Sequence, residues 1–251
     1  MDLQGQTVLI TGGSRGIGEI TVRTLHQVGA HVLLHYHRGR SEAEAIAADL
    51  QGDRIYLLQA DLAVPGRARE LWSEAWQWRG AIHVLINNAA TMPSAPITED
   101  WESWSHGWQQ TLQVNLIAVA DLCREAVLHF RQQQQGIIIN LASRAAFRGD
   151  GPQFMPYAAS KGGVIALTRT LARTVAAEGI LVYAIAPGFV RTARIEELMQ
   201  TQGAQSVIAD IPMGAPADPQ DVANLITFLA SGQVPHATGA TFDINGASYF
   251  H

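Results

Sequence analysis

Short runs of aliphatic and β-branched residues alternate with longer segments of helical periodicity along the whole chain. The candidate strands are 7–10, 32–35, 55–59, 83–87, 136–141, 181–186 and 241–244. Most of them are apolar without strict alternation, which is typical of strands covered on both faces of a parallel sheet. The candidate helices lie near 16–28, 41–51, 66–78, 100–131, 156–178 and 219–231. This order predicts right-handed βαβ crossovers and an α/β fold, a doubly wound parallel sheet of about seven strands with helices on both faces.

No linker, repeat or change of composition divides the chain, so we expect one domain over residues 1–251. The one departure from smooth alternation is 189–216, which contains Gly203, Pro212, Gly214 and Pro216 and only a short helical stretch. Long irregular segments in compact domains are often functional. This one follows the carboxyl end of a strand, where open α/β sheets bind ligands. The position favours a lid over a substrate site; the alternative is a surface connection without function.

Composition narrows the class of protein. Apolar residues make up 47% of the chain and charged residues 16%, where about 25% charged is usual for soluble proteins. That excludes a disordered chain, and the low charge favours subunit interfaces in a homo-oligomer. The net charge of −5 argues against nucleic acid, whose phosphates require basic surfaces.

The single cysteine, Cys123, cannot form an intrachain disulfide. No basic segment typical of a signal peptide precedes the first candidate strand, and no apolar run reaches the roughly 18 residues that span a bilayer. The nine histidines show no metal-ligand spacing. We therefore expect a cytoplasmic protein with no metal and no membrane partner.

A glycine-rich turn, Thr-Gly-Gly-Ser-Arg-Gly-Ile-Gly at 11–18, follows the first candidate strand and opens the first candidate helix. Glycines allow a tight turn and close approach of the backbone, and a helix N-terminus offers free N–H groups to a pyrophosphate. The spacing is G-x-x-x-G-x-G rather than the commoner G-x-G-x-x-G. Its position predicts a nucleotide site; a tight strand-to-helix connection is the alternative.

The residue that selects between the two nicotinamide dinucleotides is expected about 20 positions after the glycines, as an acid for NAD or a base for NADP. The sequence there is His35-Tyr36-His37-Arg38, and no carboxylate appears until Glu42. Arg38 together with Arg15 could hold a 2′-phosphate by charge-assisted hydrogen bonds. Alternatively Arg38 is an ordinary solvated cation. The missing acid favours NADP(H) over NAD(H).

Tyr157 and Lys161 are four residues apart and so share one face of a predicted helix. A tyrosine is a poor base near neutral pH because its pKa is about 10. A cation 4 Å away favours the phenolate by about 4 kcal/mol at an effective dielectric constant of 20. This would bring the phenol towards the range useful for acid–base catalysis. The pattern is also common on plain surface helices.

Ser143 ends a predicted strand, where its hydroxyl could orient a substrate oxygen beside Tyr157. Asn115 interrupts an apolar stretch of a long predicted helix and therefore needs a buried partner. Either its side-chain hydrogen bonds have a structural role only, or it holds a water that relays protons to Lys161.

These motifs, in this order, resemble the short-chain dehydrogenase/reductase family, in its compact single-domain, Rossmann-type branch. The resemblance extends over the whole chain and rests on the glycine turn, Asp61-Leu62, Asn87-Asn88-Ala89-Ala90, Asn115, Ser143, Tyr157-x-x-x-Lys161 and Pro187-Gly188. The segment 243–249 is similar to that of 3-oxoacyl-carrier-protein reductases and their relatives.

The resemblance implies a role for each matched residue. Tyr157 would be the general acid and base, Lys161 would lower its pKa and hold the nicotinamide ribose, Ser143 would bind the substrate oxygen, and Asn115 would position the relay water. The implied cofactor-binding residues are Gly12, Ser14, Arg15, Gly16, Ile17, Gly18, His37, Arg38, Asp61, Leu62, Asn88, Ala89, Ala90, Tyr157, Lys161, Pro187, Gly188, Val190 and Thr192.

Some residues depart from the family pattern. Ala90 replaces a glycine, the gap between Ser143 and Tyr157 is one residue longer than expected, and Tyr183 replaces an asparagine without an evident reason. Trp101, Trp104 and Trp108 form one helical stripe, for which packing is the usual explanation and an aromatic wall of the substrate cleft the alternative.

The predicted function is reduction of a ketone to a secondary alcohol, or the reverse, with NADP(H). A 3-oxoacyl thioester on a carrier protein is one substrate hypothesis, which the glutamines after Arg131 and the acid Glu178 weaken because basic residues would dock an acidic carrier. A free ketone, cyclic or aromatic, is equally compatible. The hypothesis from another class is a non-catalytic NADP(H)-binding sensor or scaffold. The family further implies a homotetramer.

Overall fold

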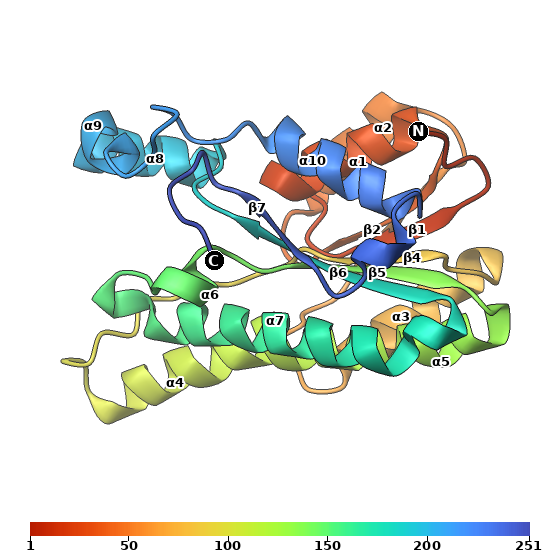
Figure 1. Ribbon diagram of the computed structural model, residues 1–251, viewed down its shortest axis with the longest axis horizontal. Helices are drawn as coiled ribbons and strands as arrows, with labels where there is room; N and C mark the ends of the chain where they lie inside the picture. The colour runs from red at the N-terminus through yellow and green to blue at the C-terminus, as the bar shows by residue number, and fades with distance from the viewer.

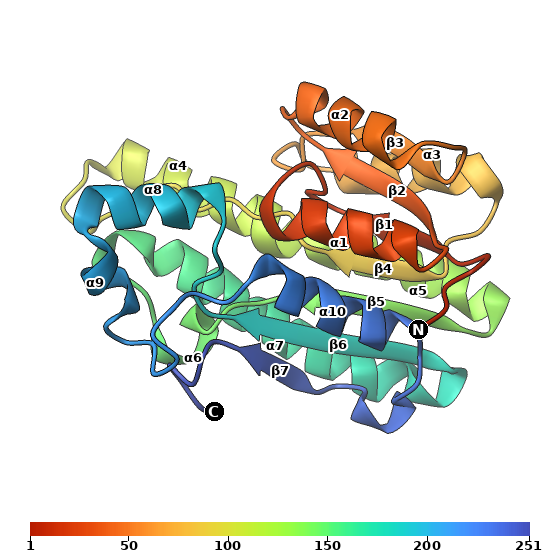
Figure 2. The same cartoon turned by 90° about the horizontal axis from the view of Figure 1, so that it is seen from above.

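The computed structural model describes residues 1–251 and is organised around one parallel sheet of seven strands (Figures 1 and 2). The order in the sheet is β3-β2-β1-β4-β5-β6-β7, and every neighbouring pair is parallel. The strands are β1 Thr7–Ile10, β2 His31–Tyr36, β3 Ile55–Gln59, β4 Val84–Asn87, β5 Gly136–Leu141, β6 Ile180–Pro187 and β7 Thr241–Ile244. The predicted doubly wound α/β fold is confirmed.

Helices cover both faces of the sheet and build a separate apolar core on each. Figure 1 shows α1 Gly16–Gln27, α2 Arg40–Leu50 and α10 Pro219–Ala230 on one face. The opposite face carries α3 Arg67–Arg79, α4 Trp101–Leu112, α5 Ala118–Gln133 and α7 Met155–Val175. Because both faces are buried, the central strands are apolar throughout, and each residue of β1 and β4 is buried.

The helix predicted over 100–131 is interrupted. A π-helical turn, Gln113–Ile117, separates α4 from α5, and Asn115 lies within it. A π-turn holds one extra residue, which rotates the helix and changes the face that Asn115 presents. The apolar pattern on either side continues, so a prediction from periodicity joins the two helices.

The segment 189–216 leaves the sheet and returns to nearly the same point. The N–H of Arg191 donates to Ala217 O at 2.9 Å, and the N–H of Ala217 donates to Phe189 O at 2.9 Å. Between these bonds lie two helices, α8 Ala193–Gln202 and α9 Ala204–Ile208, which project beyond the carboxyl edge of the sheet (Figures 1 and 2). The segment therefore contains more helix than its glycines and prolines indicate.

The structure gives a place to Tyr183 and to the three tryptophans of α4, whose roles the sequence left open. Tyr183 is fully buried in β6, and its hydroxyl donates to Val234 O at 3.0 Å. The rings of Trp101, Trp104 and Trp108 contact one another along α4, with centroids 5.3 and 5.5 Å apart. None of the three lines the cavity described below, so the stripe is not an aromatic wall of the substrate cleft. Trp104 and Trp108 are partly buried, whereas Trp101 is exposed. None of the helices combines the length and the apolarity needed to cross a bilayer.

Candidate active site

The strand order reverses between β1 and β4, because the chain crosses from β1 to β2 on one side and later returns to β4 on the other. Ligands of open α/β sheets bind at the carboxyl edge at such a switch point. A cavity of about 820 Å³ opens at this edge. Of the predicted site residues, the cavity wall contains Ile17, Asn88, Ala90, Ser143, Tyr157, Lys161, Pro187, Gly188, Val190 and Thr192. The other predicted residues do not line it; Asn115 lies behind the wall, and the rest belong to the glycine turn or to the ends of β2, β3 and β4.

The glycine turn between β1 and α1 packs too closely for side chains. A Cβ on Gly18 would lie 2.0 Å from Gly12 O. One on Gly12 would lie 2.9 Å from Ala89 Cα, and Gly12 has a φ of +67°. The backbone of the turn thereby reaches the end of β4, and the first N–H groups of α1, which have no partner within the helix, face outward.

Side chains of the same elements fix the turn against β4. The hydroxyl of Thr11 accepts the N–H groups of Asn88 and Ala89, both at 3.0 Å. The amide of Asn88 donates in turn to Thr11 O and Gly12 O, both at 2.9 Å. The predicted cofactor residue Asn88 thus holds the turn in shape as well as lining the cavity.

His35 at the end of β2 holds the other side of the turn. The N–H of Gly12 donates to His35 Nδ1 at 3.1 Å, and the N–H of Gly13 donates to His35 O at 2.8 Å. Since Nδ1 accepts a hydrogen bond, the neutral ring carries its hydrogen on Nε2, which donates to Ala60 O at 3.0 Å. Burial lowers the pKa of His35 to about 4, so the ring is neutral near pH 7. The sequence signal for this residue was a polar side chain inside an apolar strand.

The remaining features of the turn suit a dinucleotide. Thr192 lies against it, 3.2 Å from the place a Cβ of Gly16 would take. Leu62 is buried after β3, and the carboxylate of Asp61 accepts the N–H of Ala63 at 3.0 Å. A cradle of glycines at a helix N-terminus, with β3 and β6 ends on either side, fits a dinucleotide.

The region expected to hold a 2′-phosphate carries charges of both signs. Arg15 and Arg38 are exposed, and neither makes an ion pair. His37 Nε2 lies 3.4 Å from Asp61 Oδ2. Glu42, the first carboxylate after β2, is close enough to Arg15 for the cation to lower its pKa, although its own backbone and Ser41 contribute more. The two free guanidinium groups are the feature that suits a phosphate.

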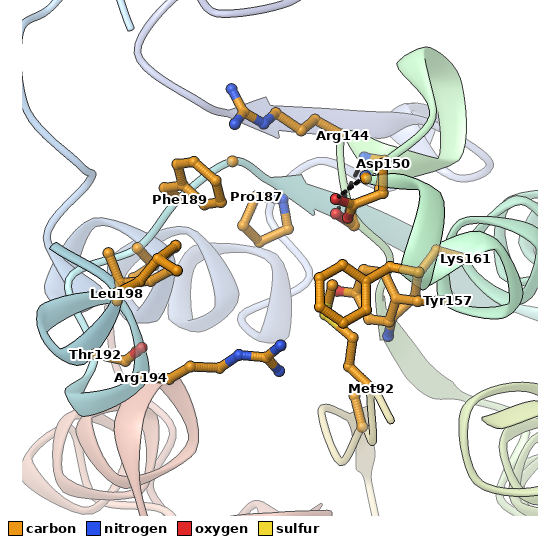
Figure 3. Close-up of a pocket in the computed structure, with 18 of the residues that line it drawn as sticks. Met92, Arg144, Asp150, Tyr157, Lys161, Pro187, Phe189, Thr192, Arg194 and Leu198 are labelled. Atoms are coloured by element: carbon orange, nitrogen blue, oxygen red, sulfur yellow. Dashed lines mark hydrogen bonds between the residues drawn. The ribbon is translucent and has the colours of Figure 1, made fainter. Parts of the chain in front are cut away.

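Tyr157, Lys161 and Ser143 all line the cavity, and Figure 3 shows Tyr157 and Lys161 side by side there. Tyr157 and Lys161 lie on α7, and Ser143 follows β5. The ammonium of Lys161 is 5.7 Å from the centre of the Tyr157 ring and donates to Leu141 O at 2.6 Å. The predicted helix face and strand end therefore do meet.

The pKa of Tyr157 shifts in the opposite direction to the expected one. Burial raises it most, Ser143 lowers it in part, and the charges of Asp150 and Arg194 act in opposite directions, Asp150 raising and Arg194 lowering it. Burial also lowers the pKa of Lys161 to about 8. In this structure the ammonium of Lys161 donates to the carbonyl of Leu141, and the expectation that Lys161 lowers the pKa of the phenol stays a prediction.

The buried partner predicted for Asn115 is the backbone of Thr91. The amide accepts the Thr91 N–H at 2.8 Å, donates to Thr91 O at 2.9 Å and lies 3.2 Å from Ser160 Oγ. Ser160 donates in turn to Tyr157 O at 2.7 Å. The amide links the π-turn to the first turns of α7, and protein groups use both of its polar atoms.

Several cavity residues were not predicted from the sequence. They include Met92, Arg144, Phe189, Arg194 and Leu198, which Figure 3 shows around Tyr157 and Pro187. Met92 follows β4, and Arg144 directly follows Ser143. Phe189, Arg194 and Leu198 belong to 189–216, the segment after β6. Their only sequence signal was their place next to a strand end.

Comparison with known proteins gives a consistent result. A model of the family described as "Enoyl-(Acyl carrier protein) reductase" matches residues 12–247. Nodulation protein G of Rhizobium sp. (strain N33) is 34% identical over 98% of this chain and 97% of its own. The 3-oxoacyl-[acyl-carrier-protein] reductases of Staphylococcus epidermidis and Rickettsia felis are 32% and 34% identical, over 97% and 98% of this chain and 99% and 98% of theirs.

Proposed function

Because the chain belongs to the short-chain dehydrogenase/reductase family, we propose that it is an NADP(H)-dependent oxidoreductase that reduces a ketone to a secondary alcohol, or catalyses the reverse reaction. The observation that carries this proposal is that Ser143, Tyr157 and Lys161 line one cavity beside the glycine turn. A non-catalytic sensor would need the turn but not these three side chains.

In the proposed mechanism, the bound nicotinamide supplies a hydride to the carbonyl carbon of the substrate. The hydroxyl of Ser143 donates a hydrogen bond to the carbonyl oxygen, and the phenol of Tyr157 gives its proton to that oxygen as the alcohol forms. Burial, which raises the pKa of Tyr157, keeps the phenol protonated before reaction. The ammonium of Lys161 would stabilise the phenolate that remains.

We assign Asn115 an indirect part in this site. Its amide is engaged with Thr91 and Ser160, so a relay water would have to use its backbone. Through Ser160 the amide fixes the start of α7 and with it the position of Tyr157.

The preference for NADP(H) rests on Arg15 and Arg38, which lie beside the glycine turn and the end of β2 without carboxylate partners. A dianionic 2′-phosphate would take charge-assisted hydrogen bonds from both. We further propose that residues 1–251 act as one catalytic domain, with 189–216 as a lid whose two ends are fixed at Arg191 and Ala217.

We also propose assembly as a homotetramer. Ile97, Trp101, Ile117 and Leu128 are apolar and exposed, and all lie on or next to α4 and α5. Such side chains suit a subunit contact. Light scattering should give a particle of about four times 27.1 kDa; a 27.1 kDa particle would contradict this assembly.

A 3-oxoacyl group on a carrier protein is the second candidate substrate, and the names of two of the relatives, both 3-oxoacyl-[acyl-carrier-protein] reductases, favour it. Against it, Arg131 is neutralised by two hydrogen bonds to Glu178, at 2.6 and 2.9 Å. An acidic carrier would meet less free positive charge there.

The test of the proposed function is consumption of NADPH, followed by absorbance, with a panel of 3-oxoacyl thioesters, cyclic ketones, aromatic ketones and oxo acids. NADH is measured in parallel, and the matching alcohols are tested with NADP. Turnover of one class would establish the reaction, whereas binding of NADPH without turnover in either direction would support a binding protein.

A further inference from the structure

The cationic side chains of the cavity outnumber its acids. Its wall contains Arg144, Arg148, Arg194 and Lys161 against Asp150 and Glu197. Arg148 is paired with Asp210 at 3.1 Å, and Lys161 donates to a carbonyl. Arg144 and Arg194 therefore remain as cations that contact no carboxylate.

Arg194 extends from α8 across the cavity towards Tyr157 (Figure 3). Its guanidinium lies 5.9 Å from the centre of the Phe154 ring, and its charge is near enough to affect the Tyr157 phenol. It is the second residue of α8, where the positive end of the helix dipole disfavours a cation. Arg194 is thus an exposed cation at a position that the helix dipole does not favour, and an anionic ligand would give it a partner.

Arg144 is buried without an acid partner on the other side of Phe189. It is 6% exposed, its guanidinium stacks 4.6 Å from the centre of the Phe189 ring, and it donates to the hydroxyl of Ser248. A buried charge is usually paired. Here the guanidinium contacts one hydroxyl and one ring, and the charges of Asp210 and Asp150 act on it without forming an ion pair. An anion in the cavity would give this cation a direct partner.

The wall also contains apolar side chains, among them Phe189, Leu198, Phe154, Ile195 and Met92, beside the acids Asp150 and Glu197. A ligand that suits this arrangement has an apolar body and one anionic end.

We propose that the cavity takes a ketone that carries an anionic group, a carboxylate or a phosphate, and that Arg194 is the side chain that binds this group. Arg144 contributes positive potential from behind Phe189. This inference rests on the proposed function, because it places the ketone at Tyr157 and the anion on the α8 side. Bidentate hydrogen bonds from a guanidinium suit both anions.

The experiment compares matched pairs of ketones in which methyl esterification removes the negative charge. The carboxylate arm uses 4-acetylbenzoate and 4-oxopentanoate against their methyl esters. The phosphate arm uses 2-oxopropylphosphonate against its dimethyl ester. We expect the unmodified protein to favour the acid of at least one arm over its ester by about tenfold or more in kcat/KM, as one charge-assisted contact would give.

Arg194→Met should reduce kcat/KM of the acid to about the level of the ester, leave the ester nearly unchanged and leave the KM for NADPH unchanged. Arg194→Lys should retain part of the preference. Arg191→Met is the matched control, because Arg191 lies in the same segment but does not line the cavity. Its Nε is 3.7 Å from Glu196 Oε1. It should leave both substrates unaffected.

Three results would overturn the inference while the proposed function stands. They are esters reduced as well as acids, equal losses on both in Arg194→Met, or a rise in the KM for NADPH that accounts for the whole loss. If no ketone is reduced and no matching alcohol is oxidised, the proposed function fails, and the binding of 4-acetylbenzoate and 2-oxopropylphosphonate to the NADPH-loaded protein is measured by calorimetry. Binding that Arg194→Met abolishes would support the anion site, and absence of binding would refute it.

Discussion

The two ends of the cavity are built differently. The glycine turn and the ends of β2 and β4 form a closely packed unit in which Thr11, His35 and Asn88 satisfy one another's polar groups. The segment 189–216 is held at its two ends by backbone bonds and presents Arg194 without a partner. In our account the packed end holds the cofactor that all members of such a family need, and the open end selects the substrate.

We expect the largest loss of cofactor binding and stability from a side chain added to the closely packed glycine turn. Gly18→Ala puts a methyl group 2.0 Å from Gly12 O, which forces the turn apart. We expect NADPH binding to weaken by about 100-fold or more and the free energy of unfolding to fall by about 2 kcal/mol. The control is Gly162→Ala on α7, where the nearest atom to a Cβ is 3.8 Å away. Titration followed by NADPH fluorescence measures binding, and thermal melting measures stability. Equal losses of binding and stability in the two variants would contradict the packing argument.

His35→Leu tests the hydrogen bonds of the turn. It leaves the N–H of Gly12 and the carbonyl of Ala60 without partners, at about 1–3 kcal/mol for each buried group. We expect the free energy of unfolding to fall by about 2–4 kcal/mol. His106→Leu on α4 is the control.

The same histidine predicts an acid dependence. Its pKa is 6.5 in the unfolded chain and about 4 in the fold, so the unfolded chain binds more protons between these values. The free energy of unfolding should therefore fall as the pH decreases from 6.5 to 4. Urea titrations over this range should show a smaller fall in His35→Leu. An identical slope in both proteins would refute the neutral buried ring.

Lys161 predicts a rise in stability on the alkaline side. Its pKa falls from 10.5 to about 8 on folding, so the unfolded chain again binds more protons between these values and the free energy of unfolding increases with pH. The raised pKa of Tyr157 acts in the opposite direction above pH 10. Between pH 8 and 10 we expect a gain of about 2 kcal/mol in the cofactor-free protein. Urea titrations of Lys161→Met should lack it, and a gain of the same size there would contradict the assignment.

The smallest effect concerns the choice of cofactor. Arg38→Asp replaces a free cation by an anion next to the proposed 2′-phosphate. NADPH binding should weaken by about tenfold, with little change for NADH. Arg40→Asp is the control, because Arg40 already pairs with Glu44 at 2.7 Å. Equal losses for both cofactors would remove Arg38 from the phosphate site.

The packed end could be predicted from the sequence because its signals are local. An apolar strand, a run of glycines and a helix are adjacent in the chain, and the phase of α7 brings Tyr157 and Lys161 to one face. The predicted sheet of seven strands is confirmed for the same reason.

The open end could not be predicted, because its properties depend on distant partners. Nothing in the sequence distinguishes Arg194 from Arg191. In the structure Arg191 lies 3.7 Å from Glu196, whereas Arg194 lines the cavity. The hydroxyl of Tyr183 finds its acceptor 51 residues away. The single extra residue of the π-turn at Asn115 leaves no mark in the apolar pattern.

The central claim is that Tyr157 transfers the proton in an NADP(H)-dependent reaction. The most direct test is Tyr157→Phe, measured for NADPH turnover on the best ketone of the panel and for NADPH binding, with the exposed Tyr56→Phe as control. We predict that turnover falls by about 100-fold or more, that NADPH binding stays within about threefold of the unmodified protein, and that the control changes neither. Unchanged turnover in Tyr157→Phe would contradict the account.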